Sequence, residues 1–456
     1  MAEHQIKRGL DLPISGKPTQ TVSEGNPVTQ VAILGRDYPL MKPRFEVKVG
    51  DTVQRGQLLF DDRKADGVQF TAPAAGTVTA IHRGAKRAFQ SLVIDLSDAE
   101  KRGEGEQVTF ASYTGRTPEQ ISGDELRALL VESGLWTALR VRPQDRVPPT
   151  NIEPAAVFVT AIDTRPLAPS VSAALAGREE DFANGVKALS KLTAGETFVC
   201  VGRDGAPTVP SGDRIRTEVF SGPHPAGLPG THIHTLRPVG RTRSVVHVGY
   251  QDVAAIGHLV TTGKLDVTRV VSLAGPGVRE PRLLRTRIGA SATELTDGNL
   301  GSGELRTVSG CVLHGHTAQD AIHGFLGRYD NALAVIEEDS ERVFMGWLLP
   351  GMGKFSTLRA FASTWLPKKE MPFTTTTHGS HRAMVPIGSF ERVMPLDVMP
   401  TFLLRSLLVG DVEKAEQLGA LELAEEDLSL CSFVSTGKED YGKALRNVLT
   451  DIWREG

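Results

Sequence analysis

Three closely spaced histidines are the first residues in this sequence whose type and spacing could bind a metal. The stretch SGPHPAGLPGTHIH, residues 221–234, contains His224, His232 and His234 among three prolines and three glycines. This density of proline and glycine predicts a loop that leads into a strand and excludes a helix. On a strand, His232 and His234 would share one face and could chelate a metal, with His224 as a third ligand. No carboxylate or cysteine lies nearby, so we favour loop and strand histidines without a metal.

A second group, Cys311, His314 and His316, also imitates a set of metal ligands. Structural zinc sites usually take their ligands from two separated pairs, and no second pair accompanies this one. The histidines of HGSHRAM, residues 378–384, are a weaker signal in a loop rich in threonine and glycine. We therefore expect polar loops at both places.

Two further stretches lack the residues that bind a flavin phosphate or an iron–sulfur cluster. VESGLWTALRVRPQDRVP, residues 131–148, has one glycine and is filled by Trp136, Arg140 and Arg142. Such side chains prevent the close backbone approach that a flavin phosphate requires. Cys431 stands alone in LCSFVSTGKEDYG, whereas an iron–sulfur cluster takes four thiolates. The sequence thus predicts that this chain binds neither cofactor nor metal.

Aromatic and basic side chains supply weaker candidates for ligand or partner contacts. Such side chains usually lie in the hydrophobic core. Three aromatic residues are nevertheless candidates for lining a quinone pocket: Trp136, Trp347 and Phe373. Three arginines make the loop at 131–148 a candidate contact for an acidic partner, with a solvated loop as the favoured alternative: Arg140, Arg142 and Arg146.

Length and composition limit the class of protein. A chain of 456 residues calls for several domains, and its net charge of −3 gives no reason to expect nucleic-acid binding. The polar N-terminus does not resemble a signal peptide, and no stretch is apolar enough for a membrane span. Three widely spaced cysteines fit a reducing cytoplasm.

The elements that must position these residues change in type along the chain. Residues 41–82 alternate apolar and polar positions between turn signals, which predicts short antiparallel strands arranged as in a lipoyl-type barrel sandwich. Buried strands at 155–162 and 196–202, with helical stretches at 182–195 and 251–265, predict an α/β unit. Gly263 is expected just past the end of the second helix. Strands on either side of the Gly-Pro-Gly turn at 275–277 predict a β-grasp module, and Leu-rich stretches after residue 400 predict a helical domain.

Seven collinear blocks make the whole chain resemble the NqrA family, the A subunits of the Na⁺-translocating NADH:quinone reductase. The blocks are IKRGLDLPISGKP, FTAPAAGTV with RGAKRAFQSLVI, VESGLWTALRVRP, VFVTAIDTRPLA, FSGPHPAGLPGTHIH, RVVSLAGPGVREPRLLRTRIGAS and VPIGSFERVMPLDVMPTFLLRSLLVGD. That family is similar to RnfC and to the NADH- and FMN-binding subunit of respiratory complex I. Those relatives carry a glycine-rich flavin loop where this chain has SGLWTALRVRP, and cluster cysteines where it has CSFVSTGK.

The resemblance implies a peripheral subunit on the cytoplasmic face of the bacterial inner membrane. The complex would oxidise NADH, reduce ubiquinone and export Na⁺, using FAD, FMN, riboflavin and iron–sulfur centres held by other subunits. This chain would be a cofactor-free scaffold, with a role in quinone binding as a further expectation. Its candidate contacts for quinone or for other subunits of the complex are these residues: Trp136, Arg140, Arg142, His224, His232 and His234.

The expected fold class is a multidomain α/β and β protein with five segments. They are a barrel sandwich (1–105), a Rossmann-like α/β domain (106–257), an SLBB-type β-grasp domain (258–330), a β-rich connecting segment (331–385) and a helical domain (386–456). Two alternatives stay open: a stand-alone metal-dependent enzyme using the histidines of 224–234, and a nucleotide or flavin binder whose lost glycines are compensated elsewhere.

Overall fold

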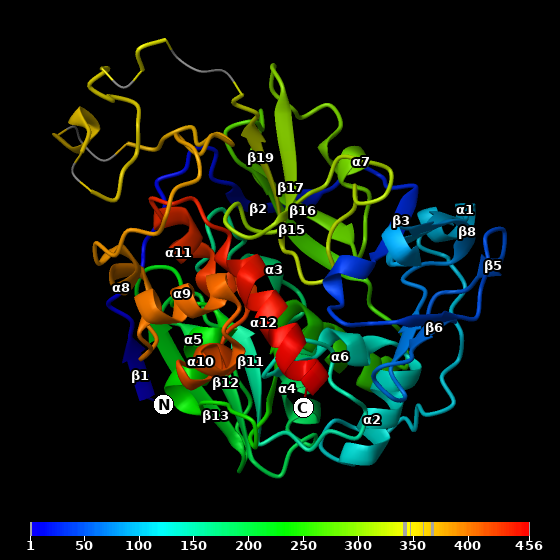
Figure 1. Cartoon of the computed structure of the whole chain (residues 1–456). Coiled ribbons are helices and arrows are strands. Elements are labelled where there is room, and N and C mark those ends of the chain that lie inside the picture. The colour runs from blue at the N-terminus through cyan, green and yellow to red at the C-terminus, as the bar shows by residue number, and fades with distance from the viewer. Residues whose placement is uncertain (1, 341–343, 347, 359, 366–368, 456) are drawn as a thin grey trace.

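A six-stranded, mostly parallel sheet forms the centre of the computed structural model, which describes residues 2–340, 344–346, 348–358, 360–365 and 369–455 (Figure 1). Its strand order is β1-β13-β12-β11-β14-β10, and only β10 runs antiparallel to its neighbour. The strands are β1 (Ala2–Gln5), β10 (Arg140–Arg142), β11 (Ala156–Ala161), β12 (Glu196–Gly202), β13 (Ile215–Ser221) and β14 (Val245–Gly249). Every residue of β11 is buried, as expected for a parallel strand covered on both faces.

Helices cover both faces of this sheet. They are α2 (Gly123–Glu132), the 3₁₀ turn η3 (Leu135–Ala138), α3 (Val171–Ala174), α4 (Glu179–Leu189), α5 (Pro229–Leu236) and α6 (Tyr250–Thr262). Helices α4 and α6 pack closely because Gly185 and Gly257 have no side chain. A Cβ atom on either glycine would collide with the backbone of the other helix. Gly263 ends α6 in a left-handed conformation, which confirms the predicted end of this helix.

The barrel sandwich consists of two antiparallel sheets, β3-β9-β8-β5 and β4-β6-β7. Its elements are β3 (Gln30–Leu34), η1 (Gly35–Asp37), β4 (Pro43–Phe45), β5 (Thr52–Val53), β6 (Leu58–Asp62), β7 (Gln69–Thr71), β8 (Gly76–Arg83), η2 (Ala85–Arg87), β9 (Phe89–Leu96) and α1 (Asp98–Lys101). The rings of Phe60 and Phe70 stack at 4.6 Å in its core. The predicted run of short antiparallel strands is confirmed.

The β-grasp unit contains a sheet of order β18-β17-β19-β15-β16-β2. Its elements are β2 (Thr19–Glu24), β15 (Thr268–Ala274), β16 (Arg282–Arg287), α7 (Ala292–Thr296), β17 (Leu305–Ser309), β18 (His316–Thr317) and β19 (Ala332–Glu337). Strands β15 and β16 pair antiparallel on either side of the Gly-Pro-Gly turn, as predicted.

The expectation of a β-rich segment at 331–385 is wrong. Among the described residues of that range, β19 is the one strand, and it belongs to the β-grasp sheet; a 3₁₀ turn, η4 (Ala362–Trp365), follows. Three prolines in that range remove backbone donors that a β-ladder needs: Pro350, Pro367 and Pro372. In Figure 1 the yellow segment after β19 projects from the body of the molecule.

Short helices close the chain, as predicted. They are α8 (Ser389–Val393), α9 (Pro400–Val409), α10 (Val412–Gln417), η5 (Ala420–Glu422), η6 (Glu425–Leu428), α11 (Ser429–Val434) and α12 (Tyr441–Glu455). Their apolar side chains form a separate core that includes Phe390 and Leu445. Figure 1 shows these helices, coloured orange to red, lying against the α/β unit.

The first residues of the chain tie the units together. Strand β1 pairs with β13 in the α/β sheet, and β2 pairs with β16 in the β-grasp sheet. The chain therefore contributes to two other units before it enters the barrel sandwich at β3. The division at residues 105, 257, 330 and 385 stays a proposal.

Candidate functional site

The point where the α/β sheet reverses its strand order is the natural place for a ligand in this fold. The chain passes from β11 outward to β12 and β13, then returns through α5 to β14 on the other side of β11. In open α/β sheets, ligands bind outside the carboxyl ends of the strands at such a switch point. A cavity of about 230 Å³ lies there, lined by residues that follow β11 and β14, among them Asp163, Arg165 and Tyr250.

Other units complete the walls of this cavity. The turn between β17 and β18 contributes Cys311, β18 contributes His316, the barrel sandwich contributes Asp37, and η6 contributes Glu426. Burial and the charge of Asp330 raise the pKa of Asp37 to about 7. The second histidine–cysteine group therefore borders the cavity, whereas its sequence pattern predicts an ordinary polar loop.

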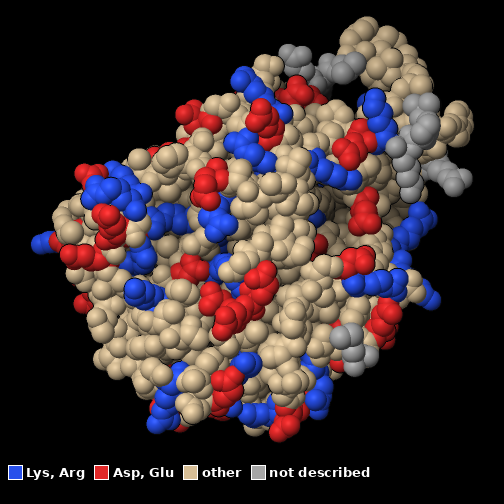
Figure 2. All heavy atoms as spheres, turned by 180° about the vertical axis from the view of Figure 1, so that it is seen from behind, with Lys and Arg blue, Asp and Glu red and all other residues tan. Residues whose placement is uncertain are grey.

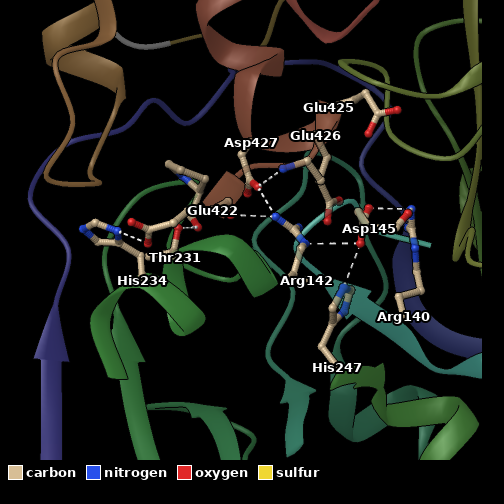
Figure 3. Close-up of polar contacts among 12 residues, drawn as sticks. Arg140, Arg142, Asp145, Thr231, His234, His247, Glu422, Glu425, Glu426 and Asp427 are labelled. Atoms are coloured by element: carbon tan, nitrogen blue, oxygen red, sulfur yellow. Dashed lines mark hydrogen bonds and ion pairs between the residues drawn. The ribbon is translucent and has the colours of Figure 1, made fainter. Parts of the chain in front are cut away.

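A cluster of buried charges connects the α/β sheet to the C-terminal helices beside this cavity (Figure 3). The side chain of Arg142 has no exposed surface. Its Nη1 donates to Asp427 Oδ2 and to the backbone carbonyl of Glu422, both at 2.9 Å, and its Nε donates to Asp145 Oδ1 at 3.2 Å. One arginine thereby joins β10 to η5 and η6.

Asp145 is the carboxylate at the centre of this cluster. Besides Arg142, it pairs with Arg140 Nη2 at 2.5 Å and accepts a hydrogen bond from His247 Nε2 at 2.9 Å. Burial opposes its charge, but the two guanidinium groups outweigh burial and hold the pKa of Asp145 well below its ordinary value. Burial lowers the pKa of His247, so a neutral imidazole donates to an ionised carboxylate.

The predicted contact residues of the 131–148 stretch are thus mostly interior. Trp136 is 1% exposed and donates from Nε1 to the carbonyl of Pro148 at 2.8 Å. Arg142 is buried, and Arg140 is partly buried against the ring of Tyr329. The expectation of a solvated basic loop is wrong at Arg142, because β10 adds this residue to the sheet and the cluster neutralises its charge.

The expected strand at the end of SGPHPAGLPGTHIH is also wrong, because residues 229–236 form α5. Pro229 occupies the first turn, where a missing N–H costs nothing and the fixed φ of proline suits a helix. Residues two apart on a helix point in nearly opposite directions, so His232 and His234 cannot chelate one ion.

The three histidines make separate contacts instead. His232 Nε2 donates to the carbonyl of Ala226 at 3.0 Å, and burial lowers the pKa of this imidazole to about 3. His224 lies 3.2 Å from the hydroxyl of Thr164, and burial lowers its pKa to about 4.

His234 joins α5 to the C-terminal helices. It donates from Nδ1 to Glu422 at 2.8 Å and accepts at Nε2 from the backbone N–H of Asp397 at 2.8 Å. Within the described residues, no group of three or more His, Cys, Asp or Glu side chains is placed to hold a metal. The geometry therefore gives no support to the alternative of a metal-dependent enzyme.

Of the remaining aromatic candidates, Phe373 does not line the cavity. Phe373 packs against Phe355 and Phe433 at ring distances of 5.6 and 6.2 Å. Trp347 falls outside the described residues. Sequence reasoning does not single out Asp145, Asp427 or Tyr250, although the position of Tyr250 directly after a buried strand is a usable signal.

Comparison with known proteins places these units in one family. Three family profiles match: the NqrA N-terminal barrel-sandwich hybrid domain at residues 4–97, the NqrA second alpha/beta domain at 121–265 and the NQRA C-terminal domain at 270–320. A solved NAD⁺-reducing [NiFe]-hydrogenase aligns with 51% of this chain and 49% of its own at 14% identity and a TM-score of 0.36, which carries no argument.

Curated relatives match over nearly the full length. A protein from Hahella chejuensis is 52% identical over 99% of this chain and 100% of its own length. Proteins from Shewanella amazonensis and Haemophilus influenzae are each 50% identical over 99% of both chains. All three are named as the A subunit of the Na(+)-translocating NADH-quinone reductase. With the barrel sandwich, the α/β domain and the β-grasp unit in the same order, this chain belongs to the NqrA family.

Proposed function

We propose that this chain is a cofactor-free scaffold subunit of a Na⁺-translocating NADH-quinone reductase, held by its partners on the cytoplasmic face of the inner membrane. The full-length similarity to the NqrA proteins supports a place in that complex. Hydride transfer, electron carriage by flavins and iron–sulfur centres, and Na⁺ movement would then reside in the other subunits. In the part of the chain that the structure describes, no helix has the length and hydropathy of a membrane span.

The packing of residues 134–142 is the observation that carries this proposal. Gly134 is the only glycine in this stretch, so it is the residue at which a phosphate could approach the backbone closely. A Cβ atom on Gly134 would lie 2.2 Å from the hydroxyl oxygen of Thr71 in the barrel sandwich. Trp136 and Leu139 fill the core directly after it. This backbone is therefore used to join two units, which leaves no space for a flavin phosphate against it.

The cysteines support the same proposal. All three are free and buried, and they occupy separate parts of the molecule. Burial raises the pKa values of Cys311 and Cys431 to about 12 and holds that of Cys200 well above its ordinary value. Because the three thiols lie apart from one another, none of them belongs to the set of four thiolates that a cluster takes.

A quinone contact is the finer part of the proposal. An apolar cleft of about 60 Å³ lies where the barrel sandwich, η3 and the β-grasp unit meet, lined by Tyr38, Phe70, Leu135 and Leu326 among others. Trp136 stands between two lining residues, Leu135 and Thr137. The cleft is small, so a quinone ring would have to widen it, and Trp136 is positioned to report the event.

Assembly tests the scaffold role. In a bacterium that lacks its own NqrA protein, an affinity-tagged copy of this chain should co-purify with the remaining subunits and restore NADH-driven ubiquinone reduction in membrane vesicles. Full activity without the chain, or restored activity without co-purification, would contradict the proposal.

A fluorescence titration tests the quinone contact separately. Short-chain ubiquinone added to the purified full chain should quench tryptophan emission to a plateau, and Trp136→Phe should remove most of the saturable part. Linear quenching that is unchanged in Trp136→Phe would show that quinone does not bind beside η3, while leaving the scaffold role intact.

A further inference from the structure

The cavity at the switch point has a feature that the scaffold role does not use. One of its walls is the N-terminus of α6, where Gly249, Tyr250 and Gln251 line the space. Gly249 is the N-cap residue and offers no side chain to the first turn of this 13-residue helix. The first N–H groups of a helix have no intrahelical acceptor and carry partial positive charge, which favours an anion.

Two buried hydroxyls in the same wall also have no partner. Thr160, 7% exposed, and Tyr250, 2% exposed, both line the cavity, and neither hydroxyl has a hydrogen-bond partner among the described residues. The amide of Gln251 lies near the Tyr250 hydroxyl, but its Nε2 already donates to the carbonyl of Val270 and to Asn331, and its Oε1 already accepts from the N–H of Val270. Buried polar groups in folded proteins are normally satisfied, so both hydroxyls point to an absent partner.

A guanidinium group that two carboxylates already neutralise lies at the same place. Arg165 follows β11, lines the cavity and keeps 27% of its side chain exposed. It bonds Asp163 at 3.2 Å and Glu426 at 2.6 Å, and a guanidinium group with five N–H donors retains further capacity.

Carboxylates also line the cavity, but most of them already face a guanidinium group. Asp252 pairs with Arg269 and Arg328, and Asp145 pairs with Arg140 and Arg142. Asp163 and Glu426 share Arg165, and Glu425 pairs with Arg446, so five of the seven lining carboxylates face a guanidinium group. An anion would therefore be held by hydrogen-bond donors rather than by net positive charge.

The turn between β17 and β18 limits the size of the ligand. Cys311 and His314 line the cavity from this turn, and His316 lines it from the start of β18. A ring nitrogen of His316 is a further buried atom without a partner among the described residues. Drug-sized ligands occupy sites of roughly 300–1,000 Å³, so a cavity of about 230 Å³ suits a smaller molecule.

We propose that this cavity binds an oxyanion, the phosphate or carboxylate group of a small molecule. The first-turn N–H groups of α6, the hydroxyls of Thr160 and Tyr250 and the guanidinium group of Arg165 form the binding site. In the neighbouring Arg142 cluster the unpaired buried atoms, Nη2 of Arg142 and Oδ1 of Asp427, belong to charged groups that already face an opposite charge, whereas the hydroxyls of this site have no partner among the described residues. The inference does not depend on the proposed function.

Calorimetric titration of the purified full chain tests the proposal with two probes, inorganic phosphate and succinate, at constant ionic strength with chloride as the balancing anion. At least one probe should bind saturably and raise the melting temperature. Tyr250→Phe and Thr160→Val should each weaken that binding by roughly tenfold or more, the loss of a hydrogen bond to a charged group. The probe that binds identifies the class of oxyanion.

Two further variants keep the test decisive. Gly249→Asp places a carboxylate at the N-cap, where φ of −80° suits any residue and no atom lies within 4 Å of a new Cβ; it should abolish binding while the fold is kept. Thr197→Val is the matched control, because it removes an equally buried and unpartnered hydroxyl on β12 away from the cavity, so binding should be unchanged. Failure of both probes, or binding that survives Tyr250→Phe, Thr160→Val and Gly249→Asp, would overturn the proposal.

Discussion

Two buried polar regions of this molecule lie close together and differ in one respect. In the Arg142 cluster, charged side chains from β10, β14 and the C-terminal helices face one another, and Arg142, Asp145 and Asp427 are all buried. Thr160 and Tyr250 line the cavity beside α6, and their buried hydroxyls have no partner among the described residues. Buried charges require opposite charges and hydrogen bonds, and the cluster supplies the opposite charges itself, although Nη2 of Arg142 and Oδ1 of Asp427 lack a partner among the described residues. We therefore interpret the cluster as a structural joint. The unpaired groups of the cavity include neutral hydroxyls that no neighbouring charge compensates.

The surface of the molecule carries a mixture of positive and negative charges. Figure 2 shows lysine, arginine, aspartate and glutamate side chains interspersed over the back of the molecule, without one large field of a single sign. The buried pairs of opposite charges in the Arg142 cluster lie inside the molecule, where the α/β unit meets the C-terminal helices. In this chain, buried electrostatics joins units far apart in sequence, as the pairing of Arg142 with Asp427 demonstrates.

Breaking the cluster should have the largest effect. Arg142→Met leaves Asp427 buried without its guanidinium partner and should destabilise the chain by about 3–5 kcal/mol in urea unfolding. Lys187→Ala, which breaks an exposed pair with Glu119, is the control and should cost less than about 1 kcal/mol. A loss for Arg142→Met as small as that of the control would mean that the cluster does not hold the units together.

A buried histidine without a counter-charge sharpens the comparison through pH. The pKa of His232 falls from 6.5 to about 3 in the folded chain, so between these values the unfolded chain binds a proton that the folded chain does not. Folding is therefore weakened as pH falls, by about 1.4 kcal/mol per pH unit for this group. Between pH 6 and pH 4, the His232→Gln variant should therefore lose less stability than the wild type, and the difference should grow by about 1.4 kcal/mol per pH unit. Parallel stability curves would show that His232 is protonated in the folded chain.

Removing an unused donor should have the smallest effect. Tyr250→Phe deletes a hydroxyl without a partner among the described residues, so its thermal unfolding should differ from that of the wild type by no more than about 0.5 kcal/mol. A loss several times larger would reveal a hydrogen bond that the hydroxyl makes in the folded chain, and the cavity would then resemble the cluster.

Much of the architecture follows from patterns that the sequence displays directly. Period-two alternation predicts the barrel-sandwich strands, the apolar run around Phe158 predicts β11, and Gly263 marks the end of α6. These features depend on residues near one another in the chain. The family resemblance, confirmed by the comparisons, depends on blocks of the same kind.

The site depends on contacts that no local pattern records. Composition alone predicts a helix break at Pro229. The structure shows a helix there, because a proline in the first turn is compatible with α5. The local sequence around Arg142 predicts a loop, and the burial of this residue depends on Asp427, 285 positions later. The segment after β19 lacks strands among its described residues because its prolines outweigh the short apolar runs around them. Long-range charge pairing and the position of proline within a helix are the physical reasons for these misses.

The absorption spectrum and metal content of the purified full chain test the central claim most directly. A cofactor-free scaffold should show only the protein band in the ultraviolet, with substoichiometric zinc and iron. Flavin absorbance, iron–sulfur bands or one metal per chain would contradict the account. In that case Trp136 would not exclude a cofactor, and the redox role assigned to the other subunits would belong at least partly to this chain.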